Sequence, residues 1–206
     1  MPLQNRITPR GEIVAVEARG RFMGNRGGAL HNEKREVVRQ YASRRWITCL
    51  LEFKGRHRVV MSPRRYTELF FLDEAVALAA GHRPCAECRR ERFNAFKAAW
   101  LPERVGNSLY ADDIDRELHR ARIEGLKQKV MYQADSQALP DGCFVQIGEA
   151  SFLVWRDGLL RWSPEGYVEK HGRRSQGDAA VLTPEPIVRC LGHGYEPEIH
   201  PSARAL

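Results

Sequence analysis

Short apolar runs separated by polar, glycine-containing segments predict strands in the first part of the chain. These runs fall at residues 12–17, 46–53, 56–61 and 69–71. Lys54 and Gly55 lie between the second and third runs and suit a tight turn, so we expect these two runs to form a β-hairpin.

Two helices are predicted on either side of a glycine and proline break. Asp73 is a suitable N-cap, and residues 75–80 are good helix formers. Gly81 suits the left-handed position after a helix, and Pro84 prevents simple continuation. A second helical pattern covers residues 89–100. Its predicted apolar face consists of Phe93, Phe96 and Trp100.

The second half of the chain predicts one helix followed by strands. Apolar residues at helical spacing predict a helix over 112–130, and the turn signal within 132–142 indicates a linker. Short apolar runs with turn residues between them then predict antiparallel strands. These runs are residues 144–147, 150–155 and 159–162, with a short strand and a helix near 181–192.

These patterns together predict an α+β protein with three segments. Residues 1–100 form a basic hairpin and helix unit that contains a zinc knuckle, and residues 101–140 form a helical connector. Residues 141–206 form a β-rich unit, either an antiparallel sheet or a partial barrel.

The charge of the chain is concentrated in its first half. The 206 residues carry a net charge of +7, but residues 1–100 hold 20 Lys and Arg against 10 Asp and Glu. Because arginine binds phosphate well, this bias predicts a nucleic-acid partner. A basic surface without a specific partner is the alternative. The expected phosphate contacts are Arg64, Arg65, Arg89, Arg90 and Arg92.

Cysteine usage and hydropathy bear on the compartment. The chain has five cysteines, an odd number, and no apolar segment typical of a secretory signal, so we expect reduced thiols and a cytoplasmic location. No run of 18 apolar residues occurs, so we expect no membrane partner.

The sequence Cys85-Ala-Glu-Cys88 offers two thiols at the spacing of metal ligands. Such a pair supplies half of a tetrahedral zinc site, and zinc is therefore the expected cofactor. A redox-active pair or two inert thiols are the alternatives. A redox pair is expected at a helix start within a βαβ unit, whereas this pair follows a helix end.

Residues 66–92 resemble the zinc-binding N-terminal domain of the Ada family of DNA-repair proteins. The resemblance rests on a helix containing Ala-Ala-Gly, here residues 73–81, followed by Arg83-Pro84-Cys85-x-x-Cys88. It implies that Cys85 and Cys88 bind zinc and that the unit contacts DNA. The family takes two further ligands from a closely spaced upstream pair, one of which accepts a methyl group. Residues 54–58 contain no cysteine, so methyl transfer is not supported.

The other metal ligands must therefore come from elsewhere in this chain. Cys49 on the predicted hairpin is the first candidate, and His31 after a glycine-rich loop is the second. Together with Cys85 and Cys88 they would form a Cys3His site. A buried apolar role for Cys49 and a loop or capping role for His31 are the alternatives, and His57 and His82 remain further candidates.

Two weaker constellations complete the candidate chemistry. A second metal site is conceivable from Cys143, Cys190, His193 and His200. Asp115 and His119 share a helix face and suit a general base, although a solvated salt-bridged face is the simpler interpretation. No P-loop, dinucleotide fingerprint, nucleophile elbow or His-Glu-x-x-His sequence occurs.

Three functions follow from these observations. The leading hypothesis is a zinc-binding protein that binds nucleic acid, in DNA repair or processing. The second is a metal-dependent hydrolase or nuclease acting on nucleic acid. The third is a protein-interaction module that uses its C-terminal half and holds a purely structural zinc.

Overall fold

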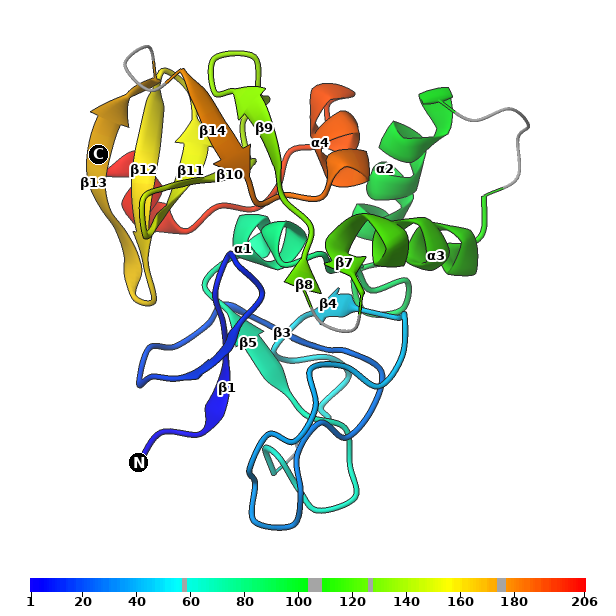
Figure 1. Cartoon of the computed structure of the whole chain (residues 1–206). Coiled ribbons are helices and arrows are strands. Elements are labelled where there is room, and N and C mark those ends of the chain that lie inside the picture. Colours follow the sequence, from blue (N-terminus) through cyan, green and yellow to red (C-terminus); the bar gives the residue numbers. More distant parts are fainter. Residues whose placement is uncertain (57–58, 104–108, 126–127, 174–176) are drawn as a thin grey trace.

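Figure 1 shows a computed structural model of the whole chain, which describes residues 1–56, 59–103, 109–125, 128–173 and 177–206. Within these residues the strands form two six-stranded sheets and one two-stranded ribbon. Helices lie between and beside the two large sheets (Figure 1). The predicted α+β class is confirmed.

The first sheet is mixed and has the strand order β2-β1-β5-β3-β4-β6. The pairs β1/β5 and β4/β6 are parallel, and the other neighbours are antiparallel. Its strands are β1 (Gln4–Ile7), β2 (Ile13–Ala15), β3 (Phe22–Asn25), β4 (Ile47–Cys49), β5 (Leu69–Phe71) and β6 (Arg83–Pro84).

The second sheet is antiparallel throughout, with the order β13-β12-β11-β10-β14-β9. Both of its faces are covered. Phe144 and Leu153 pack in the cluster around α1, whereas Val145 and Val154 face the cluster formed with the other helices. The strands are β9 (Tyr132–Asp135), β10 (Phe144–Ile147), β11 (Ala150–Trp155), β12 (Gly158–Ser163), β13 (Gly166–Gly172) and β14 (Asp178–Val181).

Four α-helices and two 3-10 turns occur within the described ranges. They are α1 (Glu74–Ala79), α2 (Arg90–Trp100), η1 (Leu101–Glu103), α3 (Ala111–Arg122), α4 (Glu185–Gly192) and η3 (Pro201–Arg204). The predicted face of α2 is confirmed, because Phe93, Phe96 and Trp100 are all buried. In this part of the chain no helix is long and apolar enough to span a lipid bilayer.

Helix α1 lies between the two large sheets (Figure 1). All six of its residues are buried, and the five that follow Glu74 are apolar. Asp73 caps it by accepting a hydrogen bond from the Val76 amide at 2.9 Å. Residues from both 1–100 and 141–206 contribute to each of the two hydrophobic clusters, so the core is continuous across the predicted segments.

The end of α1 depends on Gly81. This residue has φ +84°, its amide donates to the Leu78 carbonyl, and the His82 amide donates to the Ala77 carbonyl. These two bonds define a Schellman motif, which confirms the helix end predicted from the sequence.

Replacing Gly81 by alanine should lower the free energy of unfolding by about 1–2 kcal/mol or more, because a side chain disfavours this backbone conformation. The added Cβ would also lie 2.6 Å from Cδ of Arg122. Gly192→Ala is the matched control, since its Cβ would meet nothing within 4 Å. Urea unfolding of both variants checks the prediction, and an equal stability of the two would contradict it.

Three local predictions are wrong. Strand β4 pairs with β3 and β6 instead of with residues 56–61, and the described residues of that segment form no strand. The helix predicted over 112–130 ends at Arg122, because the chain turns at Gly125, with φ +58°, into the ribbon of β7 (Ile123–Glu124) and β8 (Gln128–Lys129). The predicted linker contains β9, which completes the edge of the second sheet beside β14.

Candidate metal centre

The parallel pairing of β4 with β6 brings the three cysteines together. Thr48 is in register with Pro84, and the Cys85 amide donates to the Thr48 carbonyl at 2.9 Å. The next residue along β4 is Cys49, so the ladder places its side chain beside Cys85. The turn between β6 and α2 then returns Cys88 to the same place.

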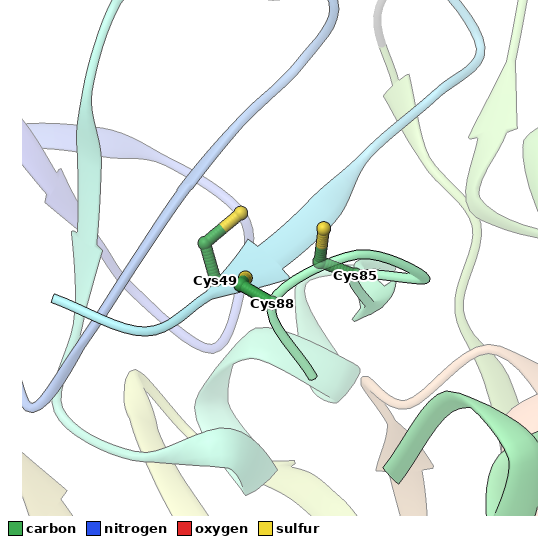
Figure 2. Close-up of side chains that lie close together, drawn as sticks. All are labelled: Cys49, Cys85 and Cys88. Carbon is green, nitrogen blue, oxygen red and sulfur yellow. The ribbon is translucent and has the colours of Figure 1, made fainter. Parts of the chain in front are cut away.

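Figure 2 shows the resulting cluster, with Cys49 from the end of β4 and both other cysteines from the turn. The three Sγ atoms all lie within 4.8 Å of one another. Cys85 is buried, whereas Cys49 and Cys88 are partly exposed. This group of three cysteines could hold a metal ion, and no other group of three potential ligands is this close within the residues described.

Main-chain amides point at these sulfurs. The Glu87 amide lies 3.4 Å from Cys85 Sγ and donates to it. The Cys88 amide also donates to Cys85, and the Leu50 amide donates to Cys88. N–H donors stabilise the thiolate relative to the thiol, and the thiolate is the form that binds metal.

The sulfurs also affect one another's ionisation. Hydrogen bonds from Cys49 and then Cys88 lower the pKa of Cys85, so this thiol ionises first. Hydrogen bonding to Cys85 and Cys88, followed by burial, raises the pKa of Cys49. Three adjacent thiolates repel one another, and a bound cation removes that repulsion. The donor set therefore fits a metal ion.

A cavity of about 470 Å³ opens beside the cluster and is lined by all three cysteines. The loop that follows β4 forms another side of it, through residues such as Phe53, Arg56 and Tyr66. Arg56 forms an ion pair with Glu87 at 2.9 Å, which ties this loop to the cysteine turn. The cluster is thus accessible from a cavity of the size that holds small ligands.

The histidine candidates lie elsewhere or cannot be placed. His31 is not brought to the cysteines, because its Nδ1 lies 2.7 Å from Thr67 Oγ1 and its Nε2 lies 3.2 Å from the Ser62 carbonyl. It ties two loops together, so the Cys3His site with His31 is not formed. His82 is buried against Trp46 and Phe71. His57 lies outside the described residues.

The five arginines predicted to contact phosphate separate into two groups. Arg64, Arg65 and Arg90 are exposed, as such contacts require. The Arg89 side chain is only 1% exposed and pairs with Glu74 at 3.1 Å and with Glu198 at 2.7 Å. The prediction for Arg89 is therefore wrong, since this side chain stabilises the interior.

Arg92 is held in the same ion-pair group as Arg89. Its guanidinium lies 3.0 Å from Glu74 and packs over the ring of Tyr195. With a side chain that is 32% exposed, Arg92 is available to an external phosphate only in part.

The weaker constellations are not assembled as ligand sets. Cys143 and Cys190 are buried in the hydrophobic cluster of α2, α3 and α4. Asp115 does not face His119, because both of its oxygens accept hydrogen bonds from Arg83, at 2.9 and 2.7 Å. His119 instead packs edge-on against Tyr41.

Sequence reasoning missed the cavity and the role of the loop after β4. The exposed apolar residues Leu50 and Leu51, directly after Cys49, are the signal that could have indicated it.

Comparison with known proteins gives no relative from which a function could be transferred. No protein-family model, no curated protein and no solved structure matches the chain.

Proposed function

We propose that the chain binds one zinc ion through Cys49, Cys85 and Cys88. The observation that carries this proposal is the convergence of three sulfurs from two separate segments within 4.8 Å. Thiolates favour zinc among the common metals, and the amide donors on the sulfurs suit a zinc–thiolate site. The resemblance of residues 66–92 to the zinc-binding domain of the Ada family supports the same metal.

Three protein ligands leave one position of a tetrahedral zinc ion for a further donor. The cavity borders the cluster, so a water molecule or another donor has room to take that position. The three thiolates would hold the metal and fix the β4–β6 edge to the start of α2.

We further propose that the surface around this cavity binds nucleic acid. Four exposed cationic side chains belong to the long segment between β4 and β5 that forms one wall of the cavity, namely Lys54, Arg56, Arg64 and Arg65. Exposed apolar side chains lie among them, with Leu51 48% and Val59 69% exposed. Cationic groups attract the phosphate backbone. Bases of single-stranded nucleic acid stack on aromatic side chains, and Phe53 lines this cavity.

Replacing Arg64 and Arg65 together by alanine should weaken binding to a fluorescent DNA oligonucleotide by about tenfold or more at 0.1 M salt. The slope of log affinity against log salt should fall by about 2, because two phosphate contacts are lost. Fluorescence anisotropy over a range of salt concentrations measures both quantities.

Arg116→Ala combined with Arg120→Ala is the matched control, because both side chains are exposed on α3 and belong neither to the segment between β4 and β5 nor to the cavity lining. Equal affinities and equal slopes for the two double variants would overturn the proposed surface. A wild-type protein without measurable affinity would overturn nucleic-acid binding itself.

A metal-dependent hydrolase acting on nucleic acid is the second candidate, and one observation favours it. Glu68 and Glu87 line the same cavity as the three cysteines, where the carboxylate of either could act as a general acid or base. Electrophoresis of the oligonucleotide after incubation with the zinc-loaded protein tests for cleavage. A protein-interaction module is less well supported, because the exposed large apolar residues described within 141–206 are only Val168 and Leu206.

A further inference from the structure

A group of cationic side chains surrounds Trp46, separate from the cysteine cluster. The guanidinium carbons of Arg26 and Arg122 each lie 4.0 Å from the centroid of the Trp46 ring. Both arginine side chains belong to residues that are 1% exposed. Lys129, from β8, lines the same cavity as these three residues.

These cations contact main-chain carbonyls instead of carboxylates. Arg26 donates to the carbonyls of Gly11 and Gln40, at 2.9 and 3.3 Å. Arg122 donates to those of Gly81 and Arg44, both at 2.6 Å. Lys129 donates to the Ala79 carbonyl at 2.6 Å. The ion pairs of the described residues include none of these three side chains, although buried charge is costly without a counter-charge.

The carboxylates whose charges act on Arg122 and Lys129 already have other partners. Asp115, which attracts Arg122, is paired with Arg83 at 2.7 Å. Glu12, which attracts Lys129, is paired with Arg10 at 3.6 Å. Each of these carboxylates is thus engaged by another cation and forms no direct ion pair with Arg122 or Lys129.

Two donor atoms at this place also lack hydrogen-bond partners. Arg122 Nε is buried without one, and so is Nδ1 of His82. His82 Nε2 lies 3.3 Å from Arg26 Nε and accepts its hydrogen bond, which leaves Nδ1 as the protonated ring nitrogen. Burial lowers the pKa of Arg26 and of Arg122 to about 9 and that of Lys129 to about 7.

Two cavities lie beside these groups and share four lining residues. An inner cavity of about 50 Å³ is lined by Arg26, Trp46, Arg122 and Lys129. An outer cavity of about 640 Å³ shares Lys129 with it and is more open to solvent. The remaining residues common to both are Arg10, Gly11 and Gln40.

We propose that the inner cavity binds a phosphate group, either inorganic phosphate or the phosphate of a small phosphomonoester whose organic part occupies the outer cavity. The dianion would supply the counter-charge that Arg26, Arg122 and Lys129 lack. Arginine forks and a lysine ammonium are the side chains best suited to phosphate oxygens. The inner cavity, at about 50 Å³, is too small for a segment of protein or nucleic acid, so the ligand is a small molecule. This site does not depend on the metal or on nucleic-acid binding.

The test titrates the metal-containing full chain with inorganic phosphate and, separately, with phenyl phosphate. Sodium chloride at equal ionic strength is the reference for non-specific screening. Melting temperature and tryptophan fluorescence are recorded, because the cations contact the Trp46 ring. We expect saturable binding of one phosphate per chain, with the melting temperature raised by about 5–10 °C at 100 times the Kd. Tighter binding of phenyl phosphate would identify a phosphomonoester, and equal or weaker binding would identify free phosphate.

Lys129→Met should raise the Kd for phosphate by about tenfold or more, because a hydrogen bond to a charged group is lost. Lys34→Met is the matched control, since Lys34 is exposed and lines neither cavity. If Lys129→Met fails to fold, Arg10→Gln at the shared wall serves instead, with an expected rise of about threefold. No saturable response beyond that to chloride would overturn the proposal, and so would an unchanged Kd in both cavity variants.

Discussion

Replacing Cys85 by serine should abolish stoichiometric metal binding and lower the melting temperature by about 10 °C or more. Structural zinc contributes its binding free energy to folding, roughly 10–16 kcal/mol in zinc-finger peptides. This chain also has two hydrophobic clusters, so only part of that energy is expected to appear as lost stability. In a chain of this size, about 1 kcal/mol corresponds to about 2–4 °C.

The position of Cys85 explains why its loss should have the largest effect of the three sulfurs. Its backbone continues the β4–β6 ladder, and its sulfur accepts hydrogen bonds from two amides of the turn. Serine at this position offers those amides a neutral hydroxyl oxygen, which is a weaker acceptor than a thiolate. Only two sulfurs then remain, and two are not enough to hold zinc firmly. The turn before α2 would then lose its attachment to β4.

Cys143→Ser provides the control, because this cysteine is fully buried but does not belong to the group of three cysteines. It should lose stability through burial of a hydroxyl group while keeping one zinc per chain. Metal content by mass spectrometry and thermal unfolding with and without chelator distinguish the two variants. If the purified wild-type protein contains no metal and Cys85 and Cys88 react as free thiols, the zinc proposal is refuted and a thiol-based activity is favoured.

Local sequence signals predicted the centre of the fold well. Asp73, the alanine-rich segment and Gly81 each act within a few residues of α1, so the helix and its end follow from neighbours in the chain. The apolar face of α2 and the strands β10, β11 and β12 follow equally from short-range periodicity. For the same reason the spacing of Cys85 and Cys88 alone identifies them as candidate ligands, and the structure places both in a group that could hold a metal ion.

Long-range pairing was the part that the sequence could not reveal. Strand β4 has an obvious neighbour in residues 56–61, yet its partners are β3 and the two-residue strand β6. A strand of only two residues, such as β6, shows no alternation of apolar and polar positions that could predict it from the sequence. Proximity in the sequence is therefore the ground on which Cys49 is a candidate ligand, whereas its position beside Cys85 depends on the register of Thr48 with Pro84.

The arginines illustrate the same limit for electrostatics. Arg89 and Arg90 are adjacent in the sequence, but the first is buried and the second is exposed. The difference arises because Glu198, 109 residues further along the chain, reaches Arg89 with its carboxylate. Arg26 and Arg122 similarly become neighbours only through their contacts with Trp46. A net positive charge thus gives the excess of cationic over anionic side chains, and it does not show which of the cations face solvent.

Replacing Glu74 by alanine should lower the free energy of unfolding by about 3–5 kcal/mol, the range for breaking a buried ion pair from one side. Its side chain is 1% exposed and accepts hydrogen bonds from the Tyr195 hydroxyl at 2.5 Å and the Glu198 amide at 2.9 Å. It is also paired with Arg89 and Arg92. The substitution leaves the buried Arg89 paired with Glu198 alone and removes two of the hydrogen bonds that hold the C-terminal tail at the start of α1.

Glu91→Ala is the matched control, because Glu91 occupies the first turn of α2 but is exposed, so its loss should change stability by no more than about 0.5 kcal/mol. A double-mutant cycle with Arg89→Met then isolates the pair. Without Glu74, the buried charge of Arg89 should destabilise the fold. The double variant should then lose less free energy of unfolding than the two single variants together, by at least about 1 kcal/mol. Additive losses would instead show that Glu74 acts through Tyr195 and the tail, and that Arg89 is neutralised by Glu198 alone.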